Sequence, residues 1–189
     1  NTIEVLSIIN SIIKKAKFNK NNSLIITENK KSYLNLFAKE YNIRTIFHRN
    51  YIGGRYSVLS EVGMLPAELM GLNVNKFKKF NLLIKNKKFI NTLINNVGST
   101  IYFIKKKKFN SVIINYDEKS ESLFKWYQQL VAESLGKKKK GLLPIVSNMP
   151  KDNHSVMQLY LDGFQNNFYT FFYVDEKKSK KLNNKIILP

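Results

Sequence analysis

The chain contains no cysteine among its 189 residues. It can therefore form no disulfide, no zinc–thiolate site and no cysteine nucleophile, and this composition fits a cytoplasmic protein. The sequence also lacks any run of about 18 apolar residues, so it predicts no membrane span. Hydrophobic residues nevertheless make up 43% of the chain, which is enough for a folded core.

Acidic residues are scarce: 13 Asp and Glu stand against 32 Lys and Arg, which gives a formal net charge of +19. Such a charge is typical of nucleic-acid-binding proteins. A second interpretation is a Lys-, Asn- and Ile-rich composition favoured by an AT-rich genome. The Lys runs at 105–108 and 137–140 support it, because they lie where helices are predicted to end and Lys suits the helix dipole. We expect no nucleic-acid partner, although a basic surface can attract anionic substrates.

Apolar runs and helical patterns alternate along the chain, and this alternation is typical of a parallel α/β sheet. Strands are predicted at 23–27, 43–47, 111–116, 141–147 and 166–176, and helices at 31–41, 120–136 and 152–163.

This order indicates three parts. We expect residues 1–50 to form the end of one α/β domain, residues 51–108 a helical connection, and residues 109–189 a second α/β domain that is incomplete at its C-terminus. The first residues, NTIEV, are typical of a helix already in progress, and the last, NNKIILP, of the beginning of a strand. The sequence is therefore expected to be an internal piece of a longer protein.

Arginine is rare as well: the chain has only Arg44, Arg49 and Arg55. Arg55 follows Gly53 and Gly54, which allow a sharp turn and a close approach to a ligand. Arg offers a planar, permanently charged fork that Lys cannot copy, so this position suits an oxyanion. The alternative is a plain turn with a surface salt bridge, and the pattern alone does not decide between them.

Glu133 lies in the last turn of the helix predicted at 120–136, on the same face as Trp126 and Gln129. The helix dipole disfavours a negative charge there and would tend to raise the pKa of Glu133, which suits a general acid or base. The alternative is a solvated Glu beside the neighbouring Lys run.

The two histidines receive different interpretations. His154 is placed at the N-terminus of the helix predicted at 152–163, where the dipole favours a neutral ring that can accept or pass a proton. The alternative is a capping or surface His. His48, at the edge of the second predicted strand, is interpreted as structural.

A further helix is predicted at the start of the chain, where Val5, Leu6, Ile9, Ile12, Ile13 and Ala16 follow helical spacing. Thr2 and Glu4 lie at its opening, where a hydroxyl and free N–H groups can bind a phosphate. The sequence contains no metal-binding cluster, no Ser-His-Asp order, no GxGxxG and no P-loop. We therefore expect neither a metal nor a cofactor. One carboxylate, one His and one Arg can move a proton beside a carbonyl and stabilise the resulting enediolate.

Three motifs together resemble the glucose-6-phosphate isomerase (phosphoglucose isomerase) family of the bacterial type. IGGRYSVLSEVG is similar to its first signature, WYQQLVAESLGK to the segment with the catalytic Glu, and SNMPKDNHSVMQLYLDG to the segment with the catalytic His. NTIEV resembles the end of its phosphate loop. Glu61 departs from the small residue usual at its position and is interpreted as a local surface change.

The resemblance implies an α/β fold, a three-layer αβα sandwich of the sugar-isomerase (SIS) type, and interconversion of glucose 6-phosphate and fructose 6-phosphate. Glu133 would shuttle the proton through a cis-enediol(ate), and Arg55 would stabilise its charge. His154 would assist ring opening, often from the partner subunit of a homodimer with a shared active site.

The resemblance also assigns supporting roles. Thr2 would bind the phosphate, Gly54 and Gln129 would contact the sugar, and Glu4 would support the His. Since the family's upstream phosphate loop and C-terminal Lys are absent from this sequence, the 189-residue piece alone is expected to be inactive or nearly so.

Three other functions stay open. One is a non-catalytic sugar-phosphate-binding module, which would have no need for Glu133 together with His154. Another is an isomerase that also accepts mannose 6-phosphate. The third is a basic nucleic-acid-binding protein.

Overall fold

The computed structural model describes residues 3–13 and 15–175, which fall into two compact units, Asn1–Asn86 and Lys87–Pro189. The division lies inside the segment predicted to be the helical connection, and the three-part organisation stays a prediction. Within the described ranges, every helix is too short or too polar to cross a membrane.

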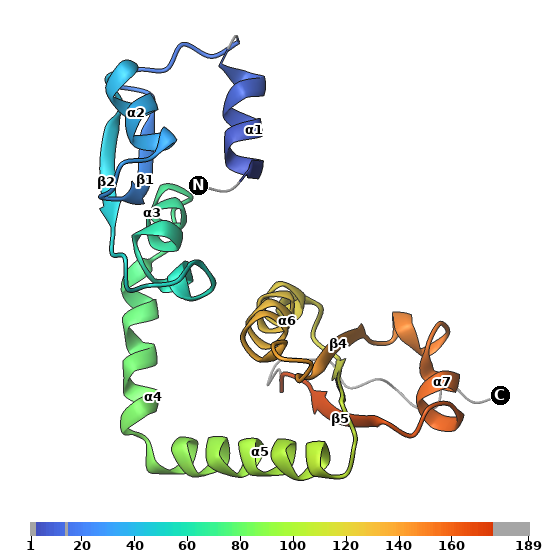
Figure 1. Cartoon of the computed structure of the whole chain (residues 1–189). Coiled ribbons are helices and arrows are strands. Elements are labelled where there is room, and N and C mark those ends of the chain that lie inside the picture. The colour runs from blue at the N-terminus through green and yellow to red at the C-terminus, as the bar shows by residue number, and fades with distance from the viewer. Residues whose placement is uncertain (1–2, 14, 176–189) are drawn as a thin grey trace, which may run out of the picture. The chain divides into compact units, whose positions relative to one another are not determined.

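The first unit contains a parallel pair of strands, β1 and β2, in which Leu24 is opposite Arg44 and Glu28 opposite His48 (Figure 1). The chain passes between them through α2, whose N-terminus is capped by the Ser32 hydroxyl. The elements of this part are α1 (Ile3–Ile12), β1 (Leu24–Glu28), α2 (Tyr33–Glu40) and β2 (Arg44–His48). The two strands and the helix predicted here are confirmed.

Short helices follow β2, within the segment 51–108 that is predicted to be a helical connection. They are η1 (Gly54–Leu59), α3 (Glu61–Leu69), η2 (Val74–Phe80) and α4 (Asn81–Lys85), η denoting a 3₁₀ helix. Helix α3 begins at Glu61, five residues before Pro66. The Ser60 hydroxyl sets this start by accepting a hydrogen bond from the Val62 amide at 3.3 Å.

The second unit is built on a three-stranded parallel sheet of order β4-β3-β5. Its elements are α5 (Lys87–Lys105), β3 (Asn110–Asn115), α6 (Glu121–Leu135), β4 (Leu143–Asn148), the 3₁₀ turn η4 (Lys151–Asn153), α7 (Met157–Asp162) and β5 (Asn167–Phe172). The central strand β3 is buried from Ser111 to Asn115, as expected for a strand covered on both faces. The predicted strands and the helix at 120–136 are confirmed.

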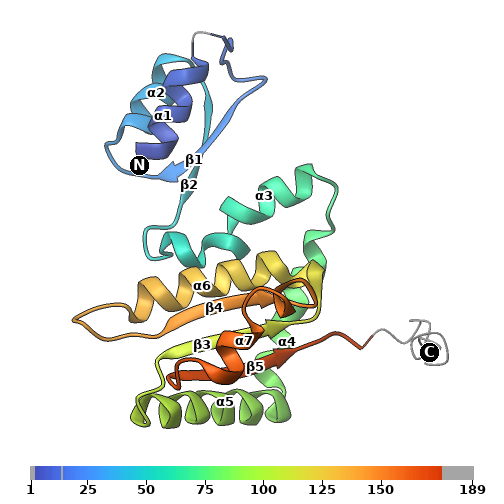
Figure 2. The ribbon, with the colours of Figure 1, turned by 90° about the vertical axis from the view of Figure 1, so that its right-hand side faces the viewer.

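Helices cover both faces of this sheet (Figure 2). Val112 and Ile114 point to the face covered by α7, where Tyr160 and Met157 pack against them. Side chains alternate along a strand, so β5 presents Phe168 and Phe172 to the other face. There Phe168 stacks on Phe103 of α5 and Phe172 meets Phe124 of α6 edge to face. The second unit therefore has three layers, α, β and α.

The helix predicted at 152–163 begins later than expected, because α7 starts only at Met157. The Asp152 carboxylate is the reason: it accepts a hydrogen bond from the Asn148 amide at 2.8 Å and so closes a turn back to β4. Val156, with φ −131°, then interrupts the helical backbone before α7. His154 consequently lies in a turn rather than in the first turn of a helix.

We expect Ile114→Ala to lower the free energy of unfolding by about 2–5 kcal/mol, because Ile114 is 2% exposed and its loss leaves a cavity under α7. The matched control is Ile94→Ala on α5, where the side chain is 61% exposed and the change should stay within about 0.5 kcal/mol. Urea unfolding of both variants measures the difference, and equal losses would contradict the described core.

Candidate functional site

The loop that carries Arg55 is a short, internally bonded 3₁₀ helix between β2 and α3. The Ser57 hydroxyl donates to the Gly54 carbonyl and the Ser60 hydroxyl to the Ser57 carbonyl, both at 2.7 Å. Ser57 itself is buried. Because the loop leaves the carboxyl end of β2, it lies at the edge where parallel α/β sheets bind ligands.

The chain turns at the two glycines, where the Tyr56 amide donates to the Gly53 carbonyl at 2.9 Å, but without the left-handed backbone that favours glycine. Positive φ is confined, among the glycines of the described chain, to Gly71 and Gly141, and Gly53 has φ −64°. The space around Gly54 is open: a Cβ placed there would meet nothing within 4 Å, whereas one at Gly53 would lie 3.6 Å from the Tyr56 ring. The loop thus exposes bare backbone beside Arg55, and a ligand can approach it closely.

Arg55 is half-buried, and its guanidinium carbon lies 5.8 Å from the centroid of the Tyr56 ring. This distance is within the range of a cation–π contact, which favours a guanidinium over the more strongly hydrated ammonium of Lys.

His48, the last residue of β2, uses both ring nitrogens. Nδ1 lies 2.5 Å from the Glu61 carboxylate and Nε2 lies 2.9 Å from the Ile52 carbonyl oxygen. The hydrogen bond to Glu61 is the main cause of a raised pKa of His48, and the bond to Ile52 adds to it. The pKa of Glu61 is lowered, first by its own backbone amide and then by His48.

This ion pair was missed by sequence reasoning, which gave Glu61 no partner. The side chain of Glu61 is 30% exposed and that of His48 only 11%. The two residues are 13 positions apart, and the only signals in the sequence were the unusual acid after Ser60 and a lone His before the loop.

Glu133 lies in the last turn of α6, as predicted, with an exposed side chain. The Gln129 side-chain amide donates to Glu133 Oε1 at 3.2 Å. The two residues therefore share one helix face, as their spacing predicts. The expected rise in the pKa of Glu133 stays a prediction.

His154 is exposed and lies between η4 and α7. Its turn is fixed to the carboxyl end of β4 by the backbone N–H of Asn148, which donates to the Asp152 carboxylate. The Asn148 side chain in turn accepts a hydrogen bond from Asn115 Nδ2 of β3 at 2.9 Å. The polar groups that order this turn are thus bonded to one another rather than to His154.

Glu133 and His154 are at opposite ends of β4. Glu133 precedes the strand, near its amino end, whereas His154 follows its carboxyl end. The six residues of β4 between them span about 20 Å at roughly 3.3 Å per residue. Within one copy of the second unit these two side chains do not face each other.

The remaining predicted site residues are at the beginning of the chain. Thr2 lies outside the described residues. Glu4 is exposed in the first turn of α1, where the helix dipole favours its negative charge. Glu4, Gly54 and Arg55 belong to the first unit, and Gln129, Glu133 and His154 to the second.

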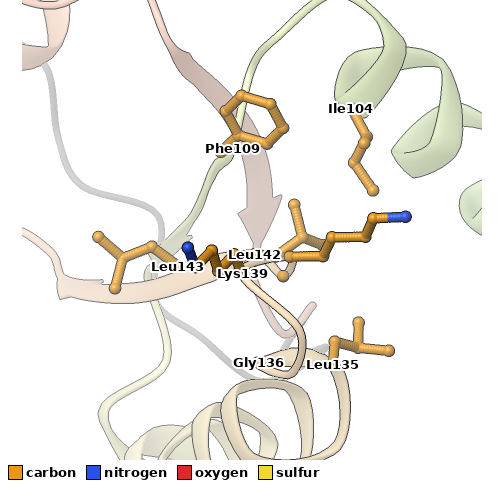
Figure 3. Close-up of a pocket in the computed structure, with 9 residues that line it drawn as sticks. Ile104, Phe109, Leu135, Gly136, Lys139, Leu142 and Leu143 are labelled. Carbon is orange, nitrogen blue, oxygen red and sulfur yellow. The ribbon is translucent and has the colours of Figure 1, made fainter.

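A separate open pocket of about 940 Å³ lies at the amino ends of β3 and β4 in the second unit (Figure 3). It is lined by Ile104, Phe109, Leu135, Gly136, Lys139, Lys140, Gly141, Leu142 and Leu143. Apart from the Lys139 and Lys140 side chains its walls are apolar or backbone, so it contains no carboxylate or imidazole. Across the described parts of the chain, no cluster of three or more His, Asp or Glu side chains could hold a metal ion.

Comparison with known proteins points to one kind of enzyme. The chain is 33% identical to glucose-6-phosphate isomerase of Methanocaldococcus jannaschii over 182 residues, which cover 90% of this chain and 44% of that protein. It is 32% identical to the enzyme of Mycoplasma capricolum over 91% of this chain and 42% of that protein. The chain thus spans less than half the length of these curated relatives, and the predicted resemblance to glucose-6-phosphate isomerases is confirmed.

A solved structure shares the fold. The crystal structure of a hypothetical protein from Thermus thermophilus matches with a TM-score of 0.75 and 23% identity, over 90% of this chain and 44% of that one. No protein-family model matches the sequence. The predicted α/β fold is confirmed.

We expect Gly63→Ala to destabilise the protein by about 1–3 kcal/mol, because a Cβ at Gly63 in α3 would lie 2.0 Å from the Val58 carbonyl oxygen of η1. The matched control is Gly98→Ala in α5, where the new Cβ meets nothing within 4 Å and should add up to about 1 kcal/mol of helix stability. Chemical unfolding distinguishes the two, and a stabilised Gly63→Ala would contradict the close approach of α3 to the Arg55 loop.

Proposed function

We propose that the full-length protein containing this chain is a cytoplasmic aldose–ketose isomerase that interconverts glucose 6-phosphate and fructose 6-phosphate, as in glycolysis and gluconeogenesis. The observation that carries the proposal is the similarity to proteins named glucose-6-phosphate isomerase over about nine-tenths of this chain, with all three motifs included. The 189-residue chain alone is expected to be inactive.

In this proposal Glu133 is the base that moves a proton between C2 and C1 through a cis-enediol(ate). Its place in the last turn of α6 supports the role, because the carbonyl ends of the helix favour the protonated form and so bring a carboxylate closer to the pKa that a proton shuttle needs. Gln129, which donates to Glu133 Oε1, would orient the carboxylate and contact the sugar.

Arg55 would stabilise the negative charge that develops on the enediolate oxygen. A fixed, half-buried cation in a bonded loop loses little freedom when the charge appears, which is the property that electrostatic catalysis requires. The open backbone at Gly54 would let the sugar come next to this cation. Neither step calls for a metal or a cofactor.

His154 would assist opening of the sugar ring from a second copy of the chain. Since β4 separates Glu133 from His154 within one protomer, a site that uses both requires either a bend of the sheet or a partner subunit. A homodimer with shared active sites meets this requirement through its two-fold symmetry. Thr2 would bind the phosphate and Glu4 would support the His, while the positive net charge attracts the anionic substrate.

The proposal is tested by the conversion of fructose 6-phosphate to glucose 6-phosphate by the full-length protein and its Glu133→Gln variant. We expect the variant to lose at least about 100-fold in kcat, because a general base contributes that much or more. The matched control is Glu121→Gln in the first turn of the same helix, which should keep wild-type activity. An inactive parent would instead favour the sugar-phosphate-binding module, and an active Glu133→Gln would mean that another residue is the base.

Mixing two inactive variants tests the shared site. In a hybrid dimer of Glu133→Gln with His154→Gln, one of the two shared sites receives both intact residues. Random assembly should therefore restore about a quarter of wild-type activity, since about half the dimers are hybrids and each has one working site. If each site were built from a single chain, the refolded mixture would stay as inactive as the separate variants.

A further inference from the structure

One imidazole bridges the two ends of the Arg55 loop. His48 contacts Ile52, just before Gly53, and Glu61, just after Ser60, so the whole of η1 lies between its two partners. The loop is thereby fixed at both ends to the last residue of β2. The hydrogen bonds inside η1 then carry this constraint to Arg55.

Both partners of His48 are acceptors. The Ile52 carbonyl oxygen can only accept, so Nε2 must carry a hydrogen and donate. The ionised Glu61 carboxylate can also only accept, at 2.5 Å from Nδ1. A neutral ring has a single N–H and would place a lone pair against one of the two oxygens. The geometry therefore selects the imidazolium form.

We propose that His48 and Glu61 form an ion-pair latch that holds the Arg55 loop in its working position, so that they act as positioning residues for the charge-stabilising step. The inference rests on the proposed function and adds two residues that touch neither substrate nor reacting atoms. The inference also accounts for the acidic side chain at position 61. Glu61 is the first residue of α3, where the helix dipole favours a negative charge, and its carboxylate pairs with the His48 imidazolium.

The charged surroundings of His48 set the pH range of the latch. Glu28 of β1 is opposite His48 in the sheet and is itself ion-paired with Lys30, while Arg49 contributes to the field at Glu61. The pKa of His48 is raised from 6.5. The stability that the protonated ring contributes to the fold is therefore fully present below pH 6.5 and is lost as the pH rises through the raised pKa. The pKa of Glu61 is lowered from 4.5. The stability that its ionised carboxylate contributes is therefore fully present above pH 4.5 and is lost as the pH falls through the lowered pKa.

The decisive variant is Glu61→Gln in the full-length protein, which keeps the shape of the side chain and removes its charge. We expect kcat to fall about 10- to 100-fold with KM within about twofold, because a displacement of about 1 Å at a catalytic group costs up to that much. The control is Glu68→Gln, in the last turn of the same helix α3 and exposed, which should leave kcat unchanged. An unchanged kcat in Glu61→Gln would overturn the inference.

A double-mutant cycle separates positioning from general loss of stability. If the latch acts through Arg55, Glu61→Gln should cost little further activity in an Arg55→Lys background, whereas independent effects would multiply. Multiplying effects would also overturn the inference. Should Glu61→Gln fail to fold, His48→Gln serves in the same cycle.

The latch and the proposed function can fail separately. NMR titration of His48 should show a pKa above 6.5 in the wild type that falls toward 6.5 in Glu61→Gln but not in Glu68→Gln. If the parent protein shows no isomerase activity while this shift is present, the proposed function fails, and the ion pair stands as a structural contact without a catalytic role. If the parent is active and the shift is absent, the latch fails alone.

Discussion

The buried central strand β3 is the constraint on which the second unit depends. It pairs in parallel with β4 and β5. Each segment that connects two strands must therefore cross from the carboxyl end of one strand to the amino end of the next. The crossover α6 therefore ends beside the amino end of β4, and the chain leaves β4 at the opposite edge. The positions of Glu133 and His154 follow from this one rule of strand pairing. Neither residue could move to the other edge without a different topology.

Polar side chains complete what the apolar core begins. Asn115 is 1% exposed, yet its amide nitrogen donates both to Asn148 Oδ1 and to the Asp117 carbonyl. A buried amide without these partners would be costly, so the ends of β3 and β4 are joined by necessity. Asp152 extends the same network into the turn before α7. The carboxyl edge of the sheet is thus ordered by the hydrogen bonds that the buried Asn115 side chain and its neighbours require.

Sequence reasoning succeeded where one local signal dominated. The run that became β3 is apolar and β-branched, and Gly136 ended α6 where it was expected. It failed where two signals competed: Asp152 could cap a helix or reach back to β4, and the second contact won. The His48–Glu61 pair could not be predicted at all, because it depends on where β2 and α3 meet in space. Of the candidate site, the shared face of Gln129 and Glu133 followed from helical spacing alone.

The turn between α6 and β4 has a consequence for how the chain can be cut. Lys137 to Lys140 are exposed, Lys138 and Lys139 have left-handed backbone, and only an isolated bridge joins Lys137 to Lys140. These four consecutive residues are the targets of trypsin-like proteases. A single cleavage here would put Glu133 and His154 on separate peptides while leaving the ladder between β3 and β4 intact. The nicked second unit would then be held together by strand pairing and side-chain packing instead of by this covalent connection.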